Sequence, residues 1–216
     1  MKRFLNAAVV AAVLATSSVP ALAAIFSFTG NLEGDNDVEL FSFTLASPSH
    51  VTLRTLSYAG GTNAAGNLIA AGGFDPIVAL FFGAESPAIL LDQNDNGIGV
   101  PVDLSTGNAF DALLDPFFDL PAGLYTVALT EFANFANGPT LGDGFLGGGI
   151  PDFDGRTSAW ALDILGANSA RAVPLPGTLA LLMAALAAGG LTRRRGRSCI
   201  RLPAPRVEAD RRPSSH

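Results

Sequence analysis

Residues 121–129, Pro-Ala-Gly-Leu-Tyr-Thr-Val-Ala-Leu, place a turn directly before a segment of alternating side chains. Tyr125, Val127 and Leu129 alternate there with smaller or polar residues. A period of two over a short segment is typical of a half-buried β-strand, because successive side chains of a strand point to opposite faces. The segment therefore predicts a half-buried β-strand.

The same alternation recurs along the chain, at residues 26–28, 41–45, 51–55 and 160–164. Residues 77–82 form a continuous apolar run instead, which suits a strand that is covered on both faces. Turns rich in Gly, Pro, Asn and Asp separate these segments, and residues 25–172 show no long amphipathic helical pattern. About seven or eight such strands predict an all-β fold, an antiparallel β-sandwich. Fourteen of the 15 phenylalanines lie in this region, and we expect them to fill the layer between the sheets.

The charge is distributed unevenly along the 216 residues. Residues 25–172 contain 17 acidic residues against Arg54, Arg156 and Arg171, whereas both ends of the chain carry net positive charge. Such an acidic domain would repel phosphates, so nucleic acid is not expected as a partner. Cys199 is the single cysteine, which excludes an intramolecular disulfide and a cysteine metal cluster.

Residues 1–23 have the three parts of a secretory signal peptide. Lys2 and Arg3 precede an apolar stretch, and Ala21-Leu22-Ala23 provides small residues around a cleavage site. The alternative is an N-terminal membrane anchor, but the apolar stretch is short and Pro20 interrupts it. We therefore expect signal peptidase to release a mature chain that begins near Ala24 and lies outside the cytoplasm.

A second apolar segment lies near the other end. Leu175–Leu191 contains a single weakly polar residue, Thr178, and would cover about 25 Å as a helix. A core helix would show a polar stripe, so a short transmembrane helix is favoured. A cluster of arginines follows and predicts that the preceding domain lies outside the membrane: Arg193, Arg194, Arg195 and Arg197.

The order of these parts resembles a known sorting signal. The residues Val173, Pro174, Leu175, Pro176 and Gly177, then the short apolar helix and the arginines, resemble the PEP-CTERM signal. The resemblance implies that a membrane-embedded exosortase cuts near the Pro-x-Pro motif of residues 173–197. Leu175 stands where that family usually has Glu, and residues 198–216 follow where such proteins normally stop. We expect these residues to form a solvated, disordered tail.

The predicted domain at 24–172 resembles a second family. Residues 34–45, 74–81, 92–95 and 121–129 follow in an order similar to that of the bacterial pre-peptidase C-terminal domain, which is a jelly-roll-like sandwich. Exported PEP-CTERM proteins that carry such a domain resemble this chain still more closely. The glycine-rich insert at 133–155 has no counterpart there. The resemblance implies an accessory or adhesive module, not an enzyme.

No catalytic residue is predicted. His50 and His216 are the two histidines, and nucleophilic catalysis usually needs such a base beside its nucleophile. We expect His50 in a surface loop at a strand start, and Cys199 has no histidine near it in sequence. The spacing of the acidic residues favours no pair of carboxylates for glycoside hydrolysis.

Calcium is the one cofactor that the sequence suggests. Ca²⁺ binds carboxylate and amide oxygens, and two turns supply them: Asp35 and Asp37, and then Asp92, Asn94 and Asp95. The second turn lacks the Glu that closes an EF-hand loop. The alternative is that these are plain turns, since Asn, Asp and Gly are ordinary turn residues.

Three functions follow from these observations. The first is an exported, non-catalytic cell-surface or extracellular-matrix protein that is sorted through its C-terminal signal. The second is a calcium-assisted module that binds extracellular polysaccharide, which would need aromatic side chains on an exposed sheet face. The third is an accessory domain of a hydrolase. Trp160 is expected in the interior with Ile164, whereas the face of Tyr125 is left open.

Overall fold

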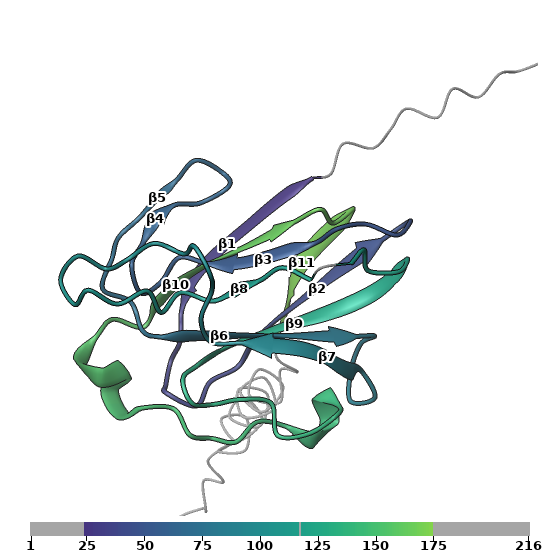
Figure 1. Ribbon diagram of the computed structural model, residues 1–216. Helices are drawn as coiled ribbons and strands as arrows, with labels where there is room; N and C mark the ends of the chain where they lie inside the picture. Colours follow the sequence, from purple (N-terminus) through teal and green to yellow (C-terminus); the bar gives the residue numbers. More distant parts are fainter. Residues whose placement is uncertain (1–23, 117, 175–216) are drawn as a thin grey trace, which may run out of the picture. The chain divides into compact units, whose positions relative to one another are not determined.

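The computed structural model describes residues 24–116 and 118–174, which form two antiparallel β-sheets (Figure 1). The order in the four-stranded sheet is β1 (Ile25–Asn31), β10 (Ala159–Leu165), β3 (Thr52–Thr55) and β8 (Leu113–Leu114). The order in the five-stranded sheet is β11 (Ser169–Val173), β2 (Glu39–Leu45), β9 (Gly123–Glu131), β6 (Pro76–Phe82) and β7 (Ile89–Asn94). A small hairpin pairs β4 (Gly61–Thr62) with β5 (Leu68–Ile69). The predicted all-β fold is confirmed.

The expected signal peptide, the membrane helix, the arginine cluster and most of the sorting motif lie outside the described residues. Of the sorting motif, Val173 is the last residue of β11 and pairs with Leu40. Within 24–116 and 118–174, no helix is both long and apolar enough to span a membrane.

The main core lies between the two sheets. Phe43 stacks on Tyr125 with ring centroids 4.9 Å apart, and Phe41 meets Trp160 edge to face at 5.6 Å. Trp160 and Ile164 are buried in this core, as predicted. Gly30 pairs with Trp160 across β1 and β10, and a Cβ at Gly30 would overlap the indole ring. The close approach of backbone and ring therefore requires glycine here.

The phenylalanines do not all fill the layer between the sheets. Phe82 and Phe118 are 42% and 70% exposed, and Phe81 and Phe145 pack in a separate cluster outside that layer, so for these four the prediction is wrong. Phe82 ends β6 and packs edge to face against Tyr125 at 5.3 Å, and Phe118 follows in a loop. Strand ends and loops lie beyond the covered part of the sheet, which explains the exposure.

The glycine-rich segment 133–155 covers the outer face of the five-stranded sheet (Figure 1). Ala79, Phe81 and Ala128 form a second buried cluster there, packed against Leu141 and Phe145 of the segment. The segment contains a short 3₁₀ helix, η1 (Leu141–Asp143), and η2 (Pro151–Gly155), a turn in which Asp152, Phe153 and Asp154 have left-handed backbone angles. This cover confirms the prediction that the apolar run 77–82 is buried on both faces, except at its last residue.

Candidate functional site

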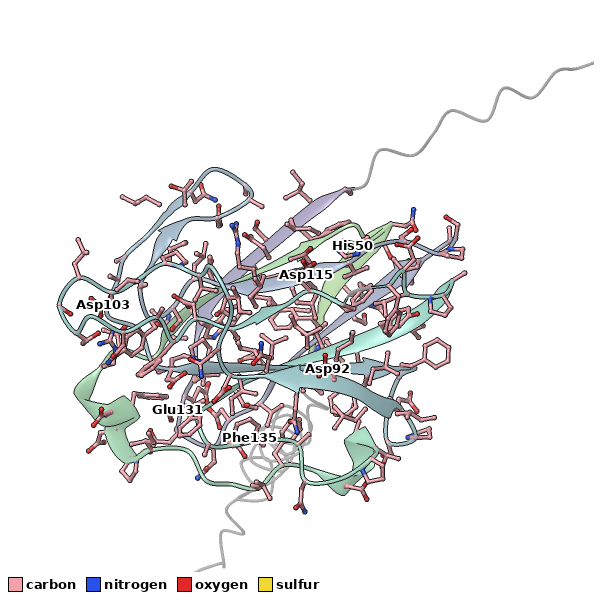
Figure 2. All side chains as sticks on the ribbon, viewed as in Figure 1. His50, Asp92, Asp103, Asp115, Glu131 and Phe135 are labelled. Atoms are coloured by element: carbon pink, nitrogen blue, oxygen red, sulfur yellow. The ribbon has the colours of Figure 1, made fainter. Side chains whose placement is uncertain are left out.

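A cavity of about 300 Å³ lies where β9 ends and β6 begins. Pro76 pairs with Glu131 in the β6–β9 ladder, and the N–H of Phe132 donates to the carbonyl of Asp75 at 2.9 Å. This register places Asp75 and Glu131 at the same end of two neighbouring strands, and both line the cavity. Glu131 is labelled in Figure 2.

The lining combines acidic and aromatic side chains that come from separate parts of the chain. Asp95 and Asn96 follow β7, whereas Asp154 belongs to η2. The aromatic part of the wall includes Phe132, whose ring is held edge to face by Phe135 with centroids 5.8 Å apart. The cavity therefore offers negative charge between apolar walls.

Three buried oxygen atoms around the cavity have no hydrogen-bond donor among the described residues. They are Oδ1 of Asp75, Oδ1 of Asn96 and Oε2 of Glu131. Glu131 as a whole is 1% exposed. Buried polar atoms in folded proteins are nearly always paired, because a lost hydrogen bond to water is otherwise not replaced. An amide oxygen and ionised carboxylate oxygens only accept hydrogen bonds, so what the three atoms lack when the two acids are ionised is a donor or a cation.

The electrostatics of the cavity disfavour ionisation of its two central acids. The pKa of Glu131 is raised to about 8, chiefly by burial and also by the negative charges of Asp35, Asp75 and Asp154. Burial also raises the pKa of Asp75 to about 7, with Asp95 and Asp111 acting in the same direction and Arg156 opposing them. The pair therefore holds protons that ordinary surface carboxyls would lose.

Arg156 lines the same cavity, but its guanidinium is committed elsewhere. One Nη2 hydrogen donates to Asp103 at 2.7 Å, and the group also donates to the carbonyls of Tyr58 and Gly73. It lies over the Tyr58 ring, 3.7 Å from the centroid. The hydrogen bond from Arg156 lowers the pKa of Asp103 to about 2. Arg156 thus neutralises Asp103 and only weakly offsets the charge on Asp75.

The predicted calcium ligands of the first turn hold the turn itself together. The Asp37 carboxylate accepts the N–H groups of Glu33 and Gly34, each at 2.7 Å. The Asp35 carboxylate accepts the N–H groups of Asp152 and Phe153, each at 3.2 Å. These bonds anchor η2 to the turn. The two aspartates are therefore occupied as in a plain structural turn, although Asp35 still contributes negative charge to the cavity.

The ligands predicted on the second turn separate into two places. Asp95 lines the acidic cavity, whereas Asp92 and Asn94 line a different depression of about 470 Å³ together with Asp115. Asn94 is the last residue of β7, and its amide donates to the carbonyl of Leu113 at 2.8 Å. Within the described part of the chain, no three His, Cys, Asp or Glu side chains are grouped so that they alone would hold a metal ion.

The sequence prediction did not include Glu131, Asp75 or Asp154. The sequence could have predicted that Glu131 is buried, because this residue continues the alternation of Tyr125, Val127 and Leu129. The alternation places its carboxylate on the same face of the strand as these three side chains. Asp75 and Asp154 had none, since only the pairing of β6 with β9 and the position of η2 bring them to the cavity.

His50 lies on the surface, as expected for a loop residue at a strand start. Its Nε2 is 2.9 Å from Oδ1 of Asp115, and about half of each side chain is exposed (Figure 2). Thr52 donates to the same carboxylate oxygen at 2.8 Å. This contact lies apart from the acidic cavity, whose lining does not include these residues.

No protein-family model matches the chain, and no curated protein matches it. The resemblances to the PEP-CTERM signal and to the pre-peptidase C-terminal domain therefore stay predictions from the sequence.

Proposed function

We propose that this chain is an exported, non-catalytic cell-surface or extracellular-matrix protein, sorted and processed through the PEP-CTERM-like signal at residues 173–197. The observation that carries the proposal is the position of the last strand among the described residues. β11 ends at Val173, immediately before Pro174. Cleavage near Pro176 would remove no residue of any described strand. The folded domain, with its jelly-roll-like, pre-peptidase C-terminal-like character, would therefore be released whole.

The charge distribution also supports this proposal. Residues 25–172 carry a formal charge of −14, and the positive charge is concentrated in the two end segments that export and sorting would remove. A strongly negative net charge keeps a released domain soluble and repelled by anionic surfaces. Signal peptidase, an exosortase-type enzyme and the membrane around the apolar helix are the partners during export.

Fractionation of the native host with intact-mass measurement tests the proposal. We expect a chain that begins near Ala24 and ends near Pro176 in the surface or extracellular fraction. The double variant Pro174→Ala/Pro176→Ala should accumulate as a longer, membrane-bound species. Pro48→Ala/Pro87→Ala is the matched control, because both of these prolines are exposed and lie outside the motif. A parent chain that keeps Leu179–Leu191 at steady state would show an ordinary membrane anchor instead.

The alternative function, a calcium-assisted glycan-binding module, would need exposed aromatic side chains other than Tyr125 and Trp160. Tyr125 is fully buried and donates its hydroxyl to the carbonyl of Pro121 at 2.7 Å. Trp160 is 6% exposed. A glycan array probed with and without chelator distinguishes the two functions, because only the module would show chelator-sensitive binding.

A further inference from the structure

We propose that the cavity around Glu131 binds a divalent cation of the oxygen-seeking class, for which Ca²⁺ is the best match. This proposal does not rest on the proposed sorting function. It rests on three buried, unpartnered oxygens that line one cavity, those of Glu131, Asp75 and Asn96. Glu131 and Asp75 lie outside the turns that the sequence indicated, whereas Asn96 belongs to the second of them.

The chemistry of the donors selects the class of ion. Two carboxylates and one amide oxygen suit Ca²⁺, which takes six to eight oxygen ligands in flexible geometry. The residues that line the cavity include neither histidine nor cysteine, the ligands that favour Zn²⁺ or Cu²⁺. A neutral donor would satisfy hydrogen bonds but would not compensate the charge that the two acids develop when they lose their protons. A cation does both.

Further carboxylates strengthen the attraction for a cation. Asp95 and Asp154 also line the cavity, and Asp35 acts on Glu131 through its charge. The nearest positive side chain in the lining, Arg156, is bound to Asp103. The local field at the cavity is therefore negative without help from distant charges, and such clefts concentrate cations.

The protein would supply only part of the coordination shell. Since no three acidic, histidine or cysteine side chains of residues 24–116 and 118–174 converge closely enough to hold an ion alone, water must complete it. A cavity of about 300 Å³ has room for an ion with several waters. A partly hydrated site predicts weak binding, with a Kd on the order of 0.1–1 mM, as in extracellular calcium modules.

Calcium titration of the full chain tests the proposal, with calorimetry and thermal melts as readouts. The Tm should rise saturably in CaCl₂ relative to NaCl of equal ionic strength. Glu131→Gln should weaken Ca²⁺ binding by at least about tenfold. Glu85→Gln should bind like the parent, because this matched control removes the same charge from an exposed turn. Equal melts in the two salts, or equal responses of the two variants, would overturn the proposal.

A second pair of variants locates the ion if Glu131→Gln does not fold. Asp75→Asn should lose the calcium response, whereas Asp92→Asn should keep it, because Asp92 lines the other depression. The reverse pattern would place the ion at the end of β7 and contradict the proposal. Secretion and processing do not enter this measurement, so its failure is distinct from failure of the sorting proposal.

Discussion

The protein buries carboxylates in two different ways. Asp111, which is fully buried, accepts the N–H groups of Ser57, Tyr58 and Ala59 at 2.5–3.2 Å and the hydroxyl of Thr55 at 3.0 Å. Glu131 is buried to nearly the same degree, yet its Oε2 has no donor among the described residues. The same fold therefore satisfies one buried acid completely and leaves another open.

Asp163, like Asp111, is a buried acid whose carboxylate accepts several hydrogen bonds. It lies in β10 between Ser27 of β1 and Arg54 of β3, which are its partners in register. The Ser27 hydroxyl and the Arg54 guanidinium each donate to it at 2.5 Å, and the N–H of Ala64 donates at 3.0 Å. Donors from three segments meet at this carboxylate. A buried acid with a structural role thus receives hydrogen bonds from several donors. The cavity oxygens that lack a donor therefore indicate a ligand rather than a structural role.

The largest change in the free energy of unfolding is expected when Asp111, the acid with a full set of hydrogen-bond donors, is removed. Asp111→Ala leaves the N–H groups of Ser57, Tyr58 and Ala59 without their acceptor, which should lower the free energy of unfolding by about 3–5 kcal/mol. Urea unfolding of the full chain measures it. A loss below about 1 kcal/mol would mean that water replaces the carboxylate and would remove the contrast with Glu131.

The pH dependence of stability should have one sign for the two cavity acids, Asp75 and Glu131, and the opposite sign for Asp103. Asp75 and Glu131 have pKa values raised to about 7 and about 8, so their stabilising contribution is present below their ordinary pKa values near 4. It is lost as the pH rises through 7 and 8. The pKa of Asp103 is lowered to about 2, so its contribution is present above its ordinary value of 3.8 and is lost as the pH falls through 2.

Unfolding in chelator across this pH range checks the sign. Stability of the parent should fall from about pH 4 to about pH 8 and level off above about pH 9. The fall should be smaller in Glu131→Gln and unchanged in Glu85→Gln. A parent whose stability is flat over this interval would show that the cavity acids ionise without penalty.

The smallest effect is expected for the acid that the turn pattern singled out. Asp92 is exposed, and its carboxylate accepts the N–H of the next residue, Gln93, at 2.8 Å. Asp92→Asn should change the free energy of unfolding by no more than about 0.5 kcal/mol, with or without Ca²⁺. A calcium-dependent change in this variant would shift the site from the cavity to β7.

Alternation predicted most of the long strands of the sandwich, including the edge strand β1, but not the edge strands β7 and β11. In β7, the register passes from Leu80–Asp92 to Phe81–Leu90, so Leu91 is an extra residue that breaks the period of two. β11 consists largely of small and polar residues at a sheet edge, where burial does not demand large apolar side chains. Both strands depend on a neighbour for their pairing, which no local pattern records.

The candidate site was predictable only in part, for a similar reason. Asp95 was predicted because turns collect Asp and Asn, and Glu131 continues an alternation that points to the core. That these two meet Asp75 follows from the pairing of Pro76 with Glu131, between strands far apart in sequence. The sequence contains the acids, whereas the topology decides which of them remain without a donor.

The ranking of the parent and Glu131→Gln in unfolding free energy, with and without Ca²⁺ at pH 8, tests the central claim most directly. In chelator, Glu131→Gln should be more stable than the parent by about 1 kcal/mol, because it removes a buried acid that lacks a donor. In saturating Ca²⁺ the order should reverse, since the ion stabilises only the protein that binds it. A ranking that is the same in both conditions would show that the cavity around Glu131 holds no cation.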